Sequence, residues 1–120
     1  MLHFEIKDVQ SMKSALTEFC RFLTDSRVSA ERVFDSKLIV DELVSNVLRH
    51  AEGVACFTGL VSDGFVVVRV LSNVAYVPPT QSVCSSVYSE HGRGLFLVDS
   101  ICSERFIDED GAIVVKIKMG

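Results

Sequence analysis

The sequence predicts an α+β fold, a two-layer α/β sandwich in which helices cover one face of a mixed, mostly antiparallel sheet. Two amphipathic helices follow a single N-terminal strand, and two pairs of strands joined by tight turns come later. Helices and hairpins in this order bury their apolar sides by packing in two layers. The chain of 120 residues has the length of one domain, and no repeat or change in composition divides it. We therefore expect residues 1–120 to form a single domain.

One strand and two helices make up the first half of the chain. Apolar residues alternate with polar ones over residues 2–7, as in a half-buried strand. Apolar residues then recur at helical spacing up to about Asp25, in a helix whose predicted N-cap is Ser11. The same spacing predicts a second helix over residues 29–51, which Gly53 would end.

Strands and turns dominate the second half. Ser62-Asp63-Gly64 has the composition of a hairpin turn, and Glu109-Asp110-Gly111 is similar. The stretch rich in serine and proline between them shows no period, which is typical of a functional lid or a disordered loop. In chain order, the predicted elements are strands 54–61 and 65–71, the loop 73–90, a short helix over residues 95–101, and strands 104–108 and 112–118.

Composition and charge argue against several classes of protein. The chain carries 12 Lys and Arg against 16 Asp and Glu, a net charge of −4, whereas nonspecific binding to nucleic acid needs a basic surface. No apolar run approaches the roughly 18 residues that span a bilayer, and the N-terminus lacks the basic start of a signal peptide. The four cysteines form no CxxC pair, which is typical of reduced thiols. We expect a cytoplasmic protein that contacts neither nucleic acid nor membrane.

The second helix carries a polar seam. Helical spacing gathers Glu42, Asn46 and Arg49 on the side opposite the valines of the core face, with Ile39 and Leu43 flanking the seam. Such a seam is most often the solvated face of an amphipathic helix. It also offers an amide oxygen, a carboxylate and a guanidinium, the groups that hold Mg²⁺ and phosphate. Both interpretations stay open from spacing alone.

A glycine-rich turn precedes the short helix. Gly92-Arg93-Gly94 follows His91 and leads into Leu95. Glycines let a ligand approach the backbone closely, and the free N–H groups at a helix N-terminus attract anions. The alternatives are a phosphate-binding turn and a simple tight turn.

The two motifs together resemble a known family. The stretch from Glu42 to Ala51 resembles the N-box of the GHKL superfamily of ATPases (gyrase and histidine-kinase type), and the stretch from Gly92 to Val98 resembles its second glycine box. The short length and the His-Ala pair after the N-box are most similar to bacterial anti-sigma factor serine-protein kinases. The resemblance extends over essentially the whole chain and implies the Bergerat ATP-binding fold.

The resemblance also implies cofactors, partners and residue roles. ATP and Mg²⁺ would be the cofactors, with Glu42 as the general base and Asn46 as the magnesium ligand. In such kinases the acceptor is a serine of a STAS-domain antagonist, and a homodimer holds a sigma factor. The implied cofactor-binding positions are Asn46, Arg49, Ser72, Asn73, His91, Gly92, Arg93, Gly94 and Leu95.

The first glycine box of the family is missing. Ser72 stands where the family has the aspartate that binds the adenine amine, in the register of a strand that would end at Val70. Asn73 would replace it if the register shifted by one, and Val74 and Tyr76 stand in place of glycines. Two functions therefore stay open: an ATP-dependent serine-protein kinase, and a non-catalytic, nucleotide-defective module that regulates its partners by contact. A carboxylate at residue 72 would favour the first.

Overall fold

The structure is a computed structural model that describes residues 1–50, 54–72 and 97–119. Five strands and two long helices account for most of these residues, and residues 97–101 form a further short helical segment. The elements are β1 (Leu2–Ile6), α1 (Val9–Asp25), α2 (Ala30–His50), β2 (Ala55–Ser62), β3 (Phe65–Ser72), β4 (Glu104–Ile107) and β5 (Ile113–Lys118). Each predicted element that lies in these ranges is present, with ends shifted by one or two residues except at the start of α1.

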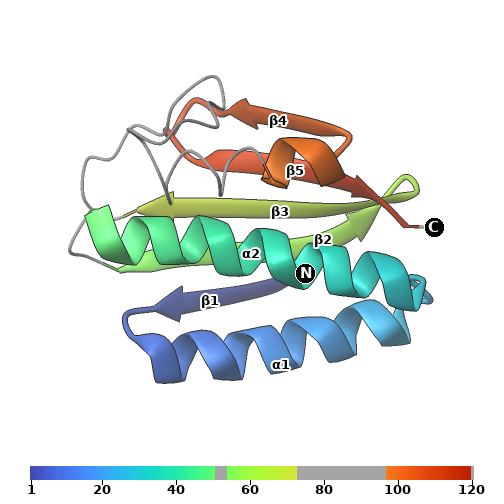
Figure 1. Ribbon diagram of the computed structural model, residues 1–120, viewed down its shortest axis with the longest axis horizontal. Coiled ribbons are helices and arrows are strands. Elements are labelled where there is room, and N and C mark those ends of the chain that lie inside the picture. Colours follow the sequence, from blue (N-terminus) through green and yellow to red (C-terminus); the bar gives the residue numbers. More distant parts are fainter. Residues whose placement is uncertain (51–53, 73–96, 120) are drawn as a thin grey trace.

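The strands form one sheet in the order β1-β2-β3-β5-β4, and every pair among the described strands is antiparallel. The expectation of a mixed sheet is therefore wrong for the described strands. Both α1 and α2 lie between β1 and β2 in the chain. After the two helices, the chain comes back beside the edge strand β1, and β2 runs antiparallel to it (Figure 1). Both helices lie against one face of the sheet, so the two-layer α+β class is confirmed.

Helix α1 begins one turn earlier than the sequence predicts. Its N-cap is Asp8, whose carboxylate accepts a hydrogen bond of 2.8 Å from the backbone N–H of Ser11. The Ser11 hydroxyl accepts in return from the Asp8 backbone N–H at 3.2 Å, which completes a capping box. Ser11 was predicted to be the N-cap and is instead the third residue of the helix.

The core lies between the helices and the sheet. Phe19 of α1 packs edge-on against Phe57 of β2, with ring centroids 4.9 Å apart, and both rings are fully buried. Gly59 leaves room for this arrangement, because a Cβ there would lie 2.5 Å from Cε1 of Phe19. The inward positions of β3 and β5 supply the rest of this layer with branched side chains: Val66, Val68, Val70, Ile113, Val115 and Ile117.

Helix α2 is buried over a wider arc than the sequence predicts. Ile39 and Leu43, which were expected to flank a polar seam, are 1% and 3% exposed. Asn46, expected on the side opposite the core, is 2% exposed. Of the two interpretations of the seam, the solvated face is therefore wrong for Asn46. The helix packs against α1 as well as against β2, β3 and β5.

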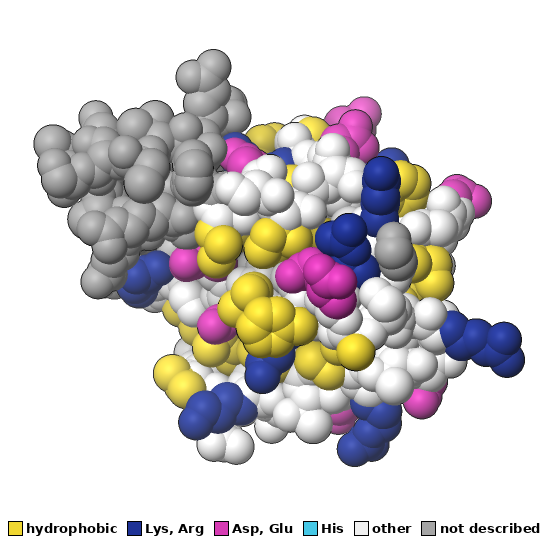
Figure 2. Space-filling view, turned by 45° about the vertical axis from the view of Figure 1, so that its right-hand side comes forward, with side chains coloured by type: hydrophobic (Ala, Val, Ile, Leu, Met, Phe, Trp, Pro, Cys, Tyr) yellow, Lys and Arg dark blue, Asp and Glu magenta, His cyan; other side chains and the backbone are white. Residues whose placement is uncertain are grey.

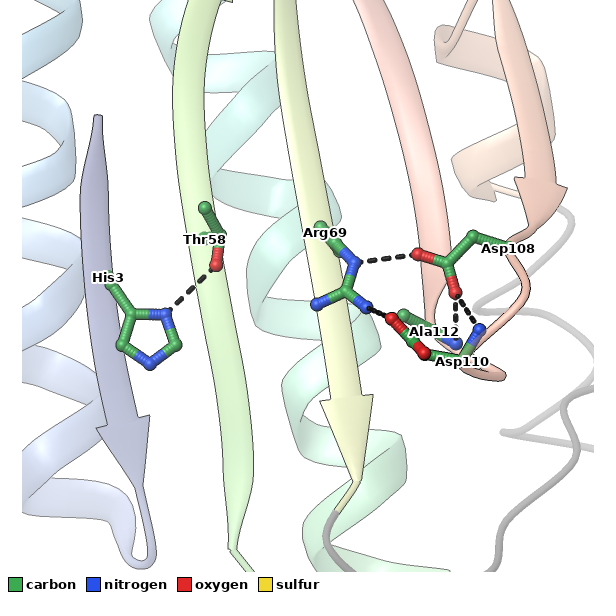
Figure 3. Close-up of polar contacts among 6 residues, drawn as sticks. All are labelled: His3, Thr58, Arg69, Asp108, Asp110 and Ala112. Carbon is green, nitrogen blue, oxygen red and sulfur yellow. Dashed lines mark hydrogen bonds and ion pairs between the residues drawn. The ribbon is translucent and has the colours of Figure 1, made fainter.

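The opposite face of the sheet carries a charged cluster (Figure 3). Arg69 of β3 donates from Nε to Asp108 at 2.7 Å and from Nη2 to Asp110 at 2.9 Å. The other oxygen of Asp108 accepts from the backbone N–H groups of Asp110 and Ala112. Hydrogen bonding from Arg69 holds the pKa of the Asp108 carboxyl below its usual range. Arg69 thus anchors the turn between β4 and β5 to the centre of the sheet.

Candidate functional site

Three of the predicted site residues meet on the second half of α2. Nη2 of Arg49 lies 2.7 Å from Oδ1 of Asn46 and 3.6 Å from Oε2 of Glu42. One guanidinium nitrogen therefore serves both an amide oxygen and a carboxylate. The residues are spaced by four and three positions, so the helix itself brings them onto adjacent turns.

Burial differs sharply among the three side chains. Asn46 is 2% exposed, whereas the side chains of Glu42 and Arg49 are 24% and 41% exposed. No described residue accepts a hydrogen bond from Nδ2 of Asn46. Leaving a buried amide N–H unpaired costs about 1–3 kcal/mol, so the site holds a donor that a ligand oxygen could meet.

Ser72 ends β3 on the face that the helices cover. It pairs with Ala55 of β2, which makes β3 one residue longer than the predicted strand 65–71. Strand alternation puts Ser72 on the same side as the buried Val68 and Val70. The C-terminal ends of β3 and α2 lie at the same end of the molecule (Figure 1). Ser72 therefore shares a face with Val68 and Val70, as the sequence predicts, and its role at an adenine site stays a prediction.

The other predicted site residues lie outside the described residues. These are Asn73, His91, Gly92, Arg93, Gly94 and Leu95, together with the predicted loop 73–90 and the predicted helix stop at Gly53. The structure therefore brings together the candidates on α2 and sets Ser72 at the same end of the molecule.

The oxygen atoms on α2 fit a divalent cation. Asn46 Oδ1 and Glu42 Oε2 already surround one positively charged group, and Mg²⁺ prefers oxygen ligands. No group of three or more His, Cys, Asp and Glu residues among the described residues could hold a metal by itself.

Thiol chemistry finds no support in the described cysteines. Cys20, Cys56 and Cys102 are free, and burial raises the pKa of the Cys20 and Cys102 thiols. Both groups are therefore less ionised at neutral pH than an ordinary cysteine.

A groove of about 540 Å³ lies between α1 and α2, and no predicted site residue lines it. Its walls are Lys13, Leu16, Thr17, Cys20 and Lys37.

No protein-family model matches the chain, and no curated protein matches it. Among the helices that the structure describes, none combines the length and apolar character needed to cross a lipid bilayer.

Proposed function

We propose that this protein is an ATP- and magnesium-binding regulatory kinase that phosphorylates a serine of a protein partner. The observation that carries the proposal is the arrangement on α2. A buried amide oxygen and a neighbouring carboxylate share one cationic group, next to an amide nitrogen that meets no described acceptor. A solvated helix face would not need to bury Asn46.

Each of the three side chains has a distinct task in this proposal. The carboxylate of Glu42, partly exposed, accepts the proton of the attacking serine hydroxyl. The new bond joins that hydroxyl oxygen to the γ-phosphorus, and the bond between the γ-phosphorus and the leaving oxygen of ADP breaks. Asn46 Oδ1 would hold Mg²⁺, which supplies charge neutralisation on the phosphates when bound. Arg49 offers its guanidinium to phosphate oxygens.

The partners follow from the resemblance to anti-sigma factor kinases. The acceptor would be a STAS-domain antagonist, and a homodimer of this chain would sequester a sigma factor in the cytoplasm. Contact with nucleic acid or membrane plays no part in this proposal.

A second candidate function is a non-catalytic module of the same fold that regulates partners by contact. Ser72 favours it, because a neutral hydroxyl replaces the carboxylate expected at the adenine site. Exposed apolar side chains also favour it. Phe34 on α2 is 59% exposed, and Figure 2 shows hydrophobic side chains gathered near the middle of one face with acidic ones beside them.

Titration with nucleotide separates the two functions. We expect Mg-ATP and Mg-ADP to bind with measurable heat in calorimetry and to raise the unfolding temperature, since a ligand of the folded state stabilises it. At a free concentration 100 times Kd, the gain is about 2.7 kcal/mol. Absence of both heat and thermal shift at millimolar Mg-ATP would favour the contact module.

Replacing Ser72 tests the adenine site. The variant Ser72→Asp restores a carboxylate at the end of β3, and we expect ATP to bind about 10-fold or more tightly, because a charge-assisted hydrogen bond contributes about 1.5–3 kcal/mol. Ser72→Ala serves as the control and should bind no more tightly than the wild type. Unchanged affinity in Ser72→Asp would show that residue 72 does not face the adenine.

A further inference from the structure

Arg49 holds the position that a cation would take between the two oxygens of α2. Its Nη2 lies 2.7 Å from Asn46 Oδ1 and 3.6 Å from Glu42 Oε2. Asn46 is buried and cannot turn its oxygen to solvent, whereas Arg49 reaches it from a side chain that is 41% exposed. The hydrogen bond to the buried Asn46 Oδ1 therefore comes from a partly exposed side chain.

A divalent ion and the guanidinium cannot share Asn46 Oδ1. The two carry charges of the same sign, and at a separation of a few ångströms their repulsion is strong in a partly buried site. The side chain of Arg49 is long and 41% exposed, whereas Asn46 is 2% exposed. The arrangement is therefore compatible with two states, the observed one with Arg49 on the amide oxygen and one with a metal ion in its place.

We propose that Arg49 acts as an internal competitor of the divalent cation, and that cation binding releases its guanidinium to bind the anion of the ligand. The inference rests on the proposed function and adds a form of regulation to that site. Cation and anion then bind with positive coupling, because each favours the state in which Arg49 has left Asn46. Without anion, the resident guanidinium weakens cation binding.

The test compares cation affinity in two matched arginine variants. Arg49→Gln keeps a polar side chain and removes the charge. Arg32→Gln does the same elsewhere on α2, where Arg32 pairs with Asp35 at 3.2 Å with the same i,i+3 spacing. Binding of Mn²⁺ alone is followed by electron paramagnetic resonance of the free ion, and circular dichroism checks that each variant is folded.

We expect Arg49→Gln to bind Mn²⁺ about fivefold more tightly than the wild type. The gain is small because the competing interaction that the substitution removes is a partly exposed one. Arg32→Gln should match the wild type. We also expect Mn²⁺ to strengthen ADP binding more in the wild type than in Arg49→Gln, because only the wild type has a guanidinium to release. Equal or weaker Mn²⁺ affinity in Arg49→Gln overturns the inference.

The outcomes also separate this inference from the proposed function. If ADP binds with Mn²⁺ but Arg49→Gln leaves the Mn²⁺ affinity unchanged, the competitor role is wrong and the nucleotide site stands. If neither Mn²⁺ nor ADP binds the wild type, both are wrong. A measurement on the wild type alone provides a check: Mg²⁺ should shift the Nε–H resonance of Arg49 and leave that of Arg32 in place, and an unmoved Arg49 resonance overturns the inference.

Discussion

Glu42 and Asn46 lie on adjacent turns of α2, so their side chains meet the same cationic group although only one of them is buried. This division suits the proposed chemistry, in which a fixed neutral oxygen holds the metal and a more accessible carboxylate moves a proton. A buried carboxylate in place of Asn46 would cost more to desolvate. Substitution of either side chain therefore tests one step of the proposed function.

The variant Glu42→Gln removes the base and keeps the shape of the side chain. We expect phosphoryl transfer to fall by about 10²–10⁴-fold, the usual contribution of general acid–base catalysis, while ATP binding stays largely intact. Transfer is measured with radiolabelled ATP, and binding is measured by calorimetry. Asp41→Asn, at the exposed neighbouring position, should leave transfer unchanged. Persistent transfer in Glu42→Gln would remove the role assigned to Glu42.

Gly59 is a packing residue whose replacement should disturb the core. In Gly59→Ala the new Cβ would lie 2.5 Å from Cε1 of Phe19, a ring held edge-on by Phe57 and unable to move freely. We expect unfolding in urea to show a loss of about 1–3 kcal/mol, the usual cost of overpacking. The control is the double variant with Phe19→Leu. Its loss should be smaller than the sum of the two single losses, and simple additivity would contradict the proposed clash.

Among the elements, α1 begins at a charged N-cap residue, Asp8. Hydrogen bonds from the backbone and side chain of Ser11 hold the pKa of the Asp8 carboxyl below its usual value. A depressed folded-state pKa contributes stability that is present above the unfolded pKa, about 3.9 for Asp, and is lost as pH falls through the folded pKa.

We expect Asp8→Ala to unfold at a lower temperature than the wild type at pH 7, with the difference shrinking as the pH falls below about 4. Thermal unfolding at several pH values measures this. Asp25→Ala removes an acid from the other end of α1, where it opposes the helix dipole, and should not lower the unfolding temperature. A difference between Asp8→Ala and the wild type that did not change with pH would assign the effect to the helix backbone and not to the charge.

Helix α2 shows where periodicity stops being informative. The 3.6-residue period correctly brings Glu42, Asn46 and Arg49 to one side of the helix. It does not predict which other elements pack against that side. The apolar neighbours Ile39 and Leu43 were a signal that this side is also packed, and both are buried. The period alone does not predict the burial of Asn46, because it does not say which other elements pack against α2.

For the whole molecule, local signals account for the elements and for the turn at Asp63 and Gly64, whose φ values of +53° and +82° match a type I′ hairpin. They do not account for the strand order. The pairing of β3 with β5 joins segments more than 40 residues apart, and its register follows from the buried branched side chains on both strands. The cluster around Arg69 was likewise not predicted, because its carboxylates come from a distant turn.

The strand order also has a consequence for synthesis on the ribosome. The last strand of the domain, β5, is inserted between β3 and β4 and does not simply extend the sheet at its rim. Until residues 113–118 emerge, a nascent chain presents β3 with a long unpaired border rich in valine, which invites association with other chains. Completion of this sheet therefore has to wait for residues 113–118, and during that interval a chaperone would protect the protein most.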